Sequence, residues 1–223
     1  MFCQIQIDII YFKKIYPNCK IIAGGVHAWH ISQSDTLKHC DYICAAEGEE
    51  LYSKLVDHLS VKPDVSPISI PGLIEKHEGK IIHTPVKPYM PMDEVPFPTY
   101  GDKKTYSIIA MNEDKPILLN EDSAVEGNWG TVHIGRGCVF RCTFCINSIH
   151  KDPTVRLRSV DRVITEIKEM LSVCKNVTSI FFMDEIFPVR TSFLTEFCEK
   201  YKKHIFIFHV FVLPETTFKK PEM

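Results

Sequence analysis

The sequence predicts an α/β protein in which two α/β segments flank a stretch of different character. The 223 residues are 45% hydrophobic, which is enough for packed cores in one or two domains. In residues 1–60, and again in residues 131–223, helical periodicity alternates with short apolar runs, a pattern typical of parallel sheets covered by helices. Residues 61–130 lack this alternation, and we expect them to be a linker with a β-hairpin and a proline-rich segment.

The first α/β segment is expected to begin with a helix and to continue through two short strands. Apolar residues at helical spacing predict a helix over 5–16, which a Pro-Asn pair ends. Buried strands are predicted over 20–23 and 41–46, with a short helix over 34–38 between them and an amphipathic helix ending near Leu59. This order resembles the back half of a doubly wound domain, so the first strands of such a domain are expected to be missing.

The middle stretch carries turn and breaker signals. Residues 72–84 predict a β-hairpin with its turn at Glu78-Gly79. Residues 85–98 contain five prolines and must be largely extended. Residues 101–130 are polar and weakly periodic, so they predict no particular element, and a lid, an insertion and a poorly ordered segment all remain open.

The second α/β segment predicts three strands and two helices. The first strand is expected over 131–134, and Ser159 is a good N-cap for an amphipathic helix whose apolar stripe is Val160, Val163, Ile164, Ile167 and Leu171. The elements that follow are a strand over 177–183, a helix over 191–203 and a strand over 204–213. Three strands cannot close a β/α barrel, so the last strand is expected to leave an exposed apolar edge.

Charge and hydropathy argue against several classes of protein. The net charge of −2 shows no excess of basic residues of the kind that nucleic-acid-binding proteins carry. No apolar run reaches the roughly 18–20 residues that a membrane-spanning helix needs. The N-terminus lacks the basic region and the small-residue cleavage site of a signal peptide. The sequence therefore predicts a cytoplasmic protein without a membrane span.

Three of the nine cysteines form a compact group. Cys138, Cys142 and Cys145 have the spacing C-x3-C-x2-C and follow the first predicted strand of the second segment. Thiolates hold iron–sulfur clusters, normally four per cluster, so a set of three leaves one iron open to another ligand. The alternatives are a zinc site completed by His133 or His150, or three buried cysteines grouped by chance. The other six cysteines are expected to be small buried hydrophobes.

This cysteine spacing, with Phe144 directly before the last cysteine, resembles the radical S-adenosylmethionine (radical SAM) superfamily. The resemblance implies that Cys138, Cys142 and Cys145 hold a [4Fe–4S] cluster whose open iron is chelated by the amino and carboxylate groups of SAM. One-electron reduction then cleaves SAM to a 5′-deoxyadenosyl radical. By the same resemblance, Phe144 occupies the aromatic position that packs near the adenine, ordinary loop packing being the alternative.

Two further groups of polar residues match positions that the superfamily uses. Asp184 and Glu185 end the second predicted strand of 131–223, where relatives place polar or acidic residues that meet the SAM amino group or the substrate. A carboxylate suits an ammonium group because the hydrogen bond is charge-assisted. Arg156 and Arg158 form an R-x-R-S run common in relatives. A solvated strand end is the alternative for the acidic pair, and surface charge or carboxylate pairing is the alternative for the two arginines.

Two loops of the first segment extend the resemblance to the cobalamin-binding radical SAM group. Gly24-Gly25 and Glu47-Gly48-Glu49 each follow a predicted strand, and the run M-D-E-V-P-F-P at 92–98 precedes the cysteines. Glycines at strand ends allow close approach of a ligand. The resemblance implies that both loops line the pocket for the cobalamin nucleotide tail. No D-x-H-x-x-G run occurs, so no lower histidine ligand to cobalt can be named.

The resemblance makes 1–60 a partial Rossmann-like cobalamin-binding domain and 131–223 the first half of a radical SAM partial β/α barrel, in a chain truncated at both ends. It implies an enzyme that cleaves SAM reductively with a [4Fe–4S] cluster and with cobalamin, C-methyl transfer being one candidate reaction. A methylthiotransferase-like enzyme without cobalamin and an inactive cluster-binding chain remain alternatives.

The resemblance also suggests partners. An electron donor such as flavodoxin or ferredoxin is implied, and a second polypeptide that completes the barrel is a further candidate. The substrate is expected to be a small molecule or a peptide. No residue in the sequence can be assigned a catalytic role.

Overall fold

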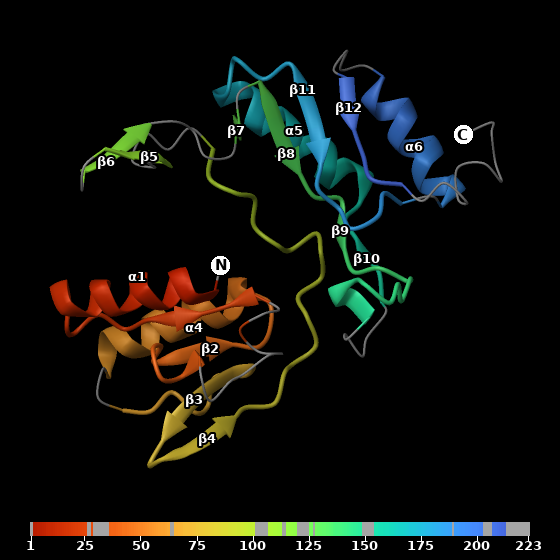
Figure 1. The fold of residues 1–223 in the computed structure, drawn as a ribbon. Coiled ribbons are helices and arrows are strands. Elements are labelled where there is room, and N and C mark those ends of the chain that lie inside the picture. Colours follow the sequence, from red (N-terminus) through yellow and green to blue (C-terminus); the bar gives the residue numbers. More distant parts are fainter. Residues whose placement is uncertain are drawn as a thin grey trace. The chain divides into compact units, whose positions relative to one another are not determined.

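The computed structural model divides the chain into two compact units, Met1–Met90 and Pro91–Met223. Helices and strands occur in both units (Figure 1), which confirms the predicted α/β class. The structure describes residues 2–25, 28, 36–62, 65–100, 107–112, 115–119, 125–126, 128–148, 154–188, 190–202 and 207–212. Within these ranges, no helix combines the length and apolar character that crossing a bilayer requires.

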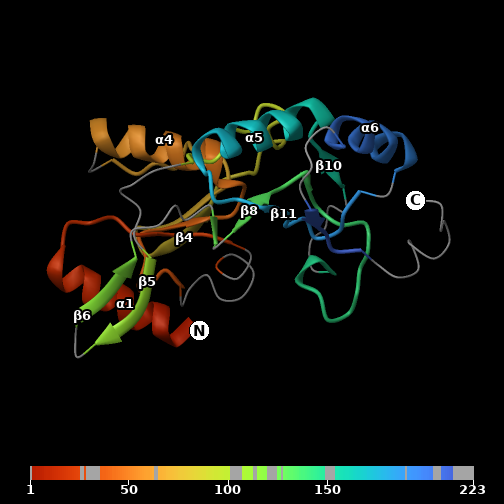
Figure 2. The ribbon, with the colours of Figure 1, turned by 90° about the horizontal axis from the view of Figure 1, so that it is seen from above.

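The first unit is built on a four-stranded mixed sheet. Its elements are α1 (Phe2–Ile15), β1 (Ile22–Ala23), β2 (Tyr42–Cys44), α4 (Gly48–Val61), β3 (Leu73–His77) and β4 (Lys80–His83). The strand order is β1-β2-β3-β4, with β1 parallel to β2 and the other neighbours antiparallel. Figure 2 shows α1 and α4 on opposite sides of this sheet.

Strand β2 is buried on both faces, because alternate side chains of a strand point to opposite sides of a sheet. Tyr42 and Cys44 pack in one cluster with Leu51 and Leu55 of α4. Ile43, between them, is fully buried in a separate cluster on the other face. Burial on both faces explains why this strand is a continuous apolar run in the sequence.

The hairpin predicted for the middle stretch is part of the first unit's sheet. Its turn lies at Glu78-Gly79 as predicted, and both residues have positive φ. Strand β3 pairs with β2, so the hairpin extends this sheet instead of lying in a linker. The hairpin's own pattern predicts its two strands, but not which third strand they join. Of the short helix predicted over 34–38, residues 34 and 35 lie outside the described residues, and 37–39 form a turn.

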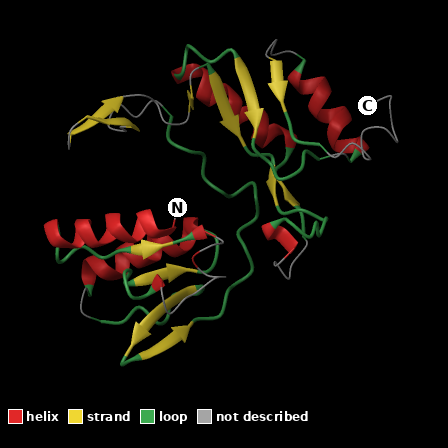
Figure 3. Cartoon of the chain, in the orientation of Figure 1, coloured by secondary structure: helices red, strands yellow, loops and turns green. Residues whose placement is uncertain are grey.

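The second unit is also built on a mixed sheet. Its elements are β5 (Ser107–Asn112), β6 (Lys115–Leu119), β7 (Val125–Glu126), β8 (Trp129–Val132), β9 (Gly135–Arg136), the 3-10 helix η1 (Ile146–Ser148), β10 (Arg156–Leu157), α5 (Val160–Val173), β11 (Ser179–Phe182), α6 (Thr191–Tyr201) and β12 (Ile207–His209). The main sheet has the order β12-β11-β8-β7, in which β8, β11 and β12 are parallel. Figure 3 shows α5 and α6 beside the strands of this sheet.

The stretch 101–130, for which the sequence predicts no element, contains strands. A second hairpin pairs β5 with β6, and β7 pairs with the start of β8. The hairpin is hard to find in the sequence because a bulge between Ile108 and Ala110 interrupts its alternation and Pro116 lies within β6. Strand β8 also begins at Trp129, two residues before the predicted strand.

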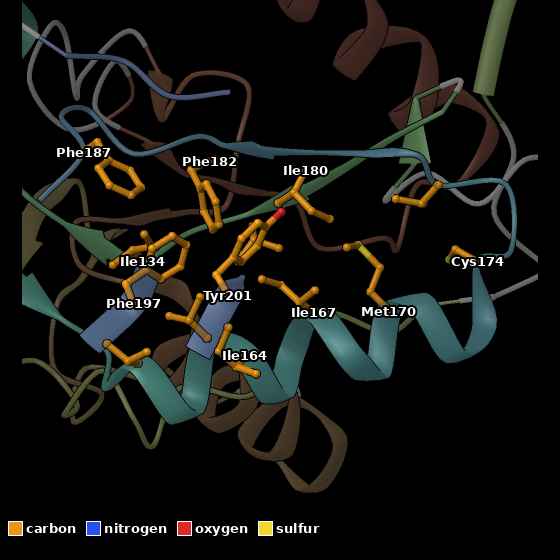
Figure 4. Close-up of a cluster of buried hydrophobic side chains, with 14 of the residues drawn as sticks. Ile134, Ile164, Ile167, Met170, Cys174, Ile180, Phe182, Phe187, Phe197 and Tyr201 are labelled. Atoms are coloured by element: carbon orange, nitrogen blue, oxygen red, sulfur yellow. The ribbon is translucent and has the colours of Figure 1, made fainter. Parts of the chain in front are cut away.

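One face of the main sheet and the two helices enclose an aromatic core (Figure 4). Phe182, at the end of β11, is fully buried. Its ring lies 5.6 Å from that of Phe187, 5.5 Å from Phe197 and 6.4 Å from Tyr201 between centroids. The apolar stripe predicted for α5 packs into the same core, which fixes the face that this helix turns to the sheet.

The predicted N-cap of α5 is confirmed, because the Ser159 hydroxyl accepts a hydrogen bond from the Arg162 N–H. Replacing Ser159 by alanine is expected to lower the free energy of unfolding by about 1 kcal/mol. Ser172 in the last turn of α5 is the control, because its hydroxyl only donates to the Glu169 carbonyl, and Ser172→Ala should cost less than about 0.5 kcal/mol. Urea unfolding measures both variants, and equal losses would contradict the capping role.

Candidate functional site

The three clustered cysteines lie on the loop that leaves the main sheet after β8. The loop passes through β9, which pairs with β10, and ends at η1. Cys138, Cys142 and Cys145 are half-buried, and none of them is in a disulfide. Phe144 is 92% exposed, so its ring is open to a ligand and is not part of the core.

Two glycines allow the start of this loop to approach the chain before α5. A Cβ atom at Gly135 would lie 2.5 Å from the Arg156 carbonyl oxygen. Gly137 has φ +93°, and its Cβ would lie 2.4 Å from the Thr154 carbonyl oxygen. Both distances are far below a normal contact, so only glycine fits. The G-x-G that precedes Cys138 is thus explained by backbone packing.

Hydrogen bonds hold the residues between β8 and the cysteines from two sides. The N–H groups of Ile134 and Gly135 donate to the Asp184 carboxylate at 3.0 and 2.6 Å. The Arg158 N–H donates to the Ile134 carbonyl at 2.8 Å. The Arg158 guanidinium donates to the His133 carbonyl at 3.3 Å. The polar backbone groups that lead into the loop are therefore satisfied by neighbouring segments.

A buried polar network lies beside these contacts. Arg158 and Glu166 form an ion pair in which the side chains are 5% and 2% exposed. The Tyr100 hydroxyl donates to the other Glu166 oxygen at 2.8 Å. Burial, followed by the negative charge of Glu166, raises the pKa of Tyr100 well above its usual range, so its proton stays in this hydrogen bond.

Residues 92–100, here called the proline strap, pack against the start of α5. The Ser159 N–H donates to the Asp93 carboxylate at 2.7 Å, and the Arg162 guanidinium donates to the Val95 carbonyl at 3.0 Å. The Arg162 guanidinium also lies 3.6 Å from the centroid of the Phe97 ring, within cation–π range. The M-D-E-V-P-F-P run therefore has a structural role: it ties the strap to the helix that follows the cysteine loop.

The donor set of the loop fits a cluster in type and in number. The three thiols of Cys138, Cys142 and Cys145 can supply three of the roughly four thiolate ligands that a [4Fe–4S] cluster normally takes. Among the described residues, no three Cys, His, Asp or Glu side chains converge on a single metal position. For the zinc alternative, His133 lies next to the loop, and His150 lies outside the described residues.

The two loops of the first unit that the sequence singled out meet at one groove. Gly24 and Gly25 follow β1, and Gly48 and Glu49 begin α4 just after β2. These four residues, together with Ile22, Cys44, Ala46 and Tyr52, line a groove of about 470 Å³. Gly25 has φ +80° and open space around its Cβ position. Glu47 does not line this groove. It lines a small neighbouring pocket, and Glu49 lines both.

The two acidic residues after β11 have different environments. Asp184 is 4% exposed, and burial raises the pKa of its carboxyl group, although the two backbone N–H bonds oppose this shift. The alternative of a solvated strand end is therefore wrong for Asp184. Glu185 is exposed at the same end of the sheet.

Sequence reasoning missed Tyr100 and Glu166, and it assigned no contact to Asp93, although Asp93 lies in the M-D-E-V-P-F-P run. One signal for Glu166 was present: it falls between Val163 and Ile167 on the apolar stripe of α5, where a carboxylate needs a buried partner. Asp93 and Tyr100 carry no such signal, because their partners lie 66 residues away in the sequence.

Comparisons with known proteins find a relative by sequence and similar folds among solved structures. No family model matches the chain. An uncharacterized methyltransferase from Pyrococcus horikoshii is 31% identical over 181 residues, which are 79% of this chain and 36% of that protein.

Two solved structures have folds similar to that of this chain. TsrM from Kitasatospora setae, a radical SAM methyltransferase solved with its tryptophan substrate and a SAM analogue, has a TM-score of 0.54 at 18% identity, covering 82% of this chain and 33% of that one. OxsB, a cobalamin-dependent SAM radical enzyme solved with aqua-cobalamin and SAM, has a TM-score of 0.61 at 20% identity, covering 91% and 27%.

The chain thus spans 36% or less of the length of these three proteins. Their similarity extends over both of its units, because 91% of the chain is covered in the match to OxsB. In its fold, the chain is similar to these radical SAM enzymes, which confirms the resemblance identified in its sequence.

Proposed function

We propose that this chain is part of a radical SAM enzyme that uses a [4Fe–4S] cluster and cobalamin, with methyl transfer as its reaction. The observation that carries the proposal is the cysteine loop: three thiols lie on one loop at the carboxyl end of β8, and the backbone leading into it is held by Asp184 and Arg158. The carboxyl ends of strands are where β/α barrels place their active sites.

Cys138, Cys142 and Cys145 are the residues that would hold the cluster. When bound, the cluster supplies the electron that cleaves SAM. The exposed ring of Phe144 is available to stack on the adenine of SAM. Exposed Glu185 is available to accept charge-assisted hydrogen bonds from the SAM amino group.

In the first unit, the groove lined by Gly24, Gly25, Gly48 and Glu49 is the proposed site for the cobalamin nucleotide tail. It lies beyond the carboxyl ends of β1 and β2, where open α/β sheets bind their ligands. Residues 1–60 would then be the C-terminal part of a doubly wound cobalamin-binding-like domain, and residues 131–223 the first half of a radical SAM partial β/α barrel.

The proposal extends to partners. The thiols need a reducing, cytoplasmic setting and an electron donor such as flavodoxin or ferredoxin. The substrate is a small molecule or a peptide that meets the remainder of the barrel, which a second polypeptide could supply.

The test is cluster and corrinoid uptake by the chain. After purification without oxygen and reconstitution with iron, sulfide and hydroxocobalamin, we expect a [4Fe–4S] EPR signal that shifts on addition of SAM. Cys142→Ala should abolish the SAM-responsive signal. Cys198→Ala, at an exposed thiol on α6 outside the cluster loop, should leave it unchanged.

The outcomes separate the candidate functions. A SAM-responsive cluster with retained corrinoid supports the proposal. A cluster without corrinoid uptake would favour an enzyme of the methylthiotransferase type. A chain that takes up no cluster, or one indifferent to SAM, would contradict the enzymatic proposal for this chain.

A further inference from the structure

The side chain of Asp184 continues the pairing of two strands beyond the point where their backbones separate. A backbone bond runs from the N–H of Met183, directly after β11, to the carbonyl of Val132, the last residue of β8, at 3.0 Å. One residue later, the Asp184 carboxylate takes the place of a backbone acceptor. Its two oxygens accept separately from Ile134 and Gly135, so neither N–H is left unpaired.

The same peptide groups are held from the opposite direction by the residue before the α5 N-cap. Arg158 donates through its backbone N–H to the Ile134 carbonyl and through its guanidinium to the His133 carbonyl. Ile134 itself is fully buried. The chain that leaves β8 is thus fixed through both its donors and its acceptors, three residues before Cys138.

We propose that Asp184 is a positioning residue of the cysteine loop, whose carboxylate sets the direction in which the chain leaves β8 and hence where the three thiolates lie. Both of its oxygens are engaged by the backbone, and its side chain is buried, so it acts through the loop and not by contact with a bound ligand. Of Asp184 and Glu185, only Glu185 is then left to contact a ligand directly.

The chemistry of the carboxylate makes this role specific. Two N–H donors facing one side chain need two acceptor oxygens. An asparagine at position 184 has nearly the same shape but only one acceptor, and its amide N–H₂ would face one of the two backbone donors. A buried donor without an acceptor is costly, so the backbone at Ile134 and Gly135 should open more often in that variant.

This inference depends on the proposed function only in assuming that the bound group is an iron–sulfur cluster. Its first test uses the chain without a bound cluster. In the apo chain, hydrogen exchange at Ile134 and Gly135 should be at least about tenfold faster in Asp184→Asn, while exchange in α5 and α6 stays within about threefold of the wild type. Glu199→Gln removes an exposed carboxylate of α6 and should change neither.

The second readout distinguishes positioning from a general contribution to stability. At a temperature where both chains remain folded, Asp184→Asn should bind several-fold less iron and sulfide per chain than the wild type, with a broadened cluster EPR signal. Normal loading and an unchanged signal would overturn the inference, as would unchanged exchange at Ile134 and Gly135.

A wild-type chain that takes up no cluster would refute the proposed function but not decide this inference. Thiol alkylation then decides it: Asp184→Asn must change the rates at Cys138, Cys142 and Cys145 relative to that at Cys198. Identical relative rates in the two chains would overturn the positioning role.

Discussion

Replacing Arg158 by alanine is expected to lower the free energy of unfolding of the unit Pro91–Met223 by about 3–5 kcal/mol. The ion pair of Arg158 with Glu166 is almost wholly buried. Removing the guanidinium leaves the carboxylate of Glu166 with Tyr100 as its remaining hydrogen-bond donor in the described network. Urea-dependent hydrogen exchange, followed by mass spectrometry, measures the effect on α5 and β11 separately from the first unit.

Lys200→Ala is the matched control for this prediction. Lys200 pairs with Asp161 and Glu196 at 2.7 Å each, but its side chain is 34% exposed, so the pairs are screened by solvent. Its loss should cost less than about 1 kcal/mol. A double variant, Arg158→Met with Glu166→Gln, removes both charges but keeps an acceptor for the Tyr100 hydroxyl, and it should recover part of the lost stability, because no buried charge is left unpaired. Equal losses in Arg158→Ala and Lys200→Ala would contradict the assigned importance of the buried pair.

The buried network matters for the site because it joins three segments that are distant in the sequence. Tyr100 is the last residue of the proline strap, and Glu166 lies in the second turn of α5. Arg158 holds the chain that leads into the cysteine loop. Loss of the network should therefore loosen the loop as well as the helix, since the same guanidinium serves both.

Helix α5 shows how far sequence reasoning reaches. Its N-cap and the face that it buries were predicted, since both follow from local patterns of about one helical turn. Its buried carboxylate was missed, because the partners of Glu166 belong to other segments and only the fold brings them together. Periodicity identifies the face of a helix that is buried, but not what it is buried against.

The candidate site also has features that local sequence patterns predict and features that only the fold creates. The cysteine spacing is local and was read from the sequence. The loops of the first unit were predicted at strand ends, and the structure brings Gly24, Gly25, Gly48 and Glu49 to one groove. The hydrogen bonds that the Asp184 carboxylate accepts from the Ile134 and Gly135 N–H groups were not predicted, because the partners lie about 50 residues apart in the sequence.

Replacing Gly137 by alanine is expected to lower the free energy of unfolding of the second unit by about 2–4 kcal/mol and to prevent cluster uptake. The φ of +93° is unfavourable for alanine, and the added Cβ would lie 2.4 Å from the Thr154 carbonyl oxygen. The contact is with backbone, so no side-chain rotation can relieve it. The loop must move away from residues 154–157, and Cys138, the next residue, must move with it.

Gly79→Ala separates the two causes of this effect. Gly79 has a similar φ of +80° at the hairpin turn of the first unit, but nothing lies within 4 Å of its Cβ position. This variant should therefore lose only the stability that an alanine with positive φ costs, about 1 kcal/mol of unfolding free energy. It should bind the cluster as the wild type does. Hydrogen exchange in each unit and iron content per chain measure both effects. If Gly137→Ala loses no more stability than Gly79→Ala, the loop can shift at little cost, and the close approach at Thr154 does not determine where Cys138 lies.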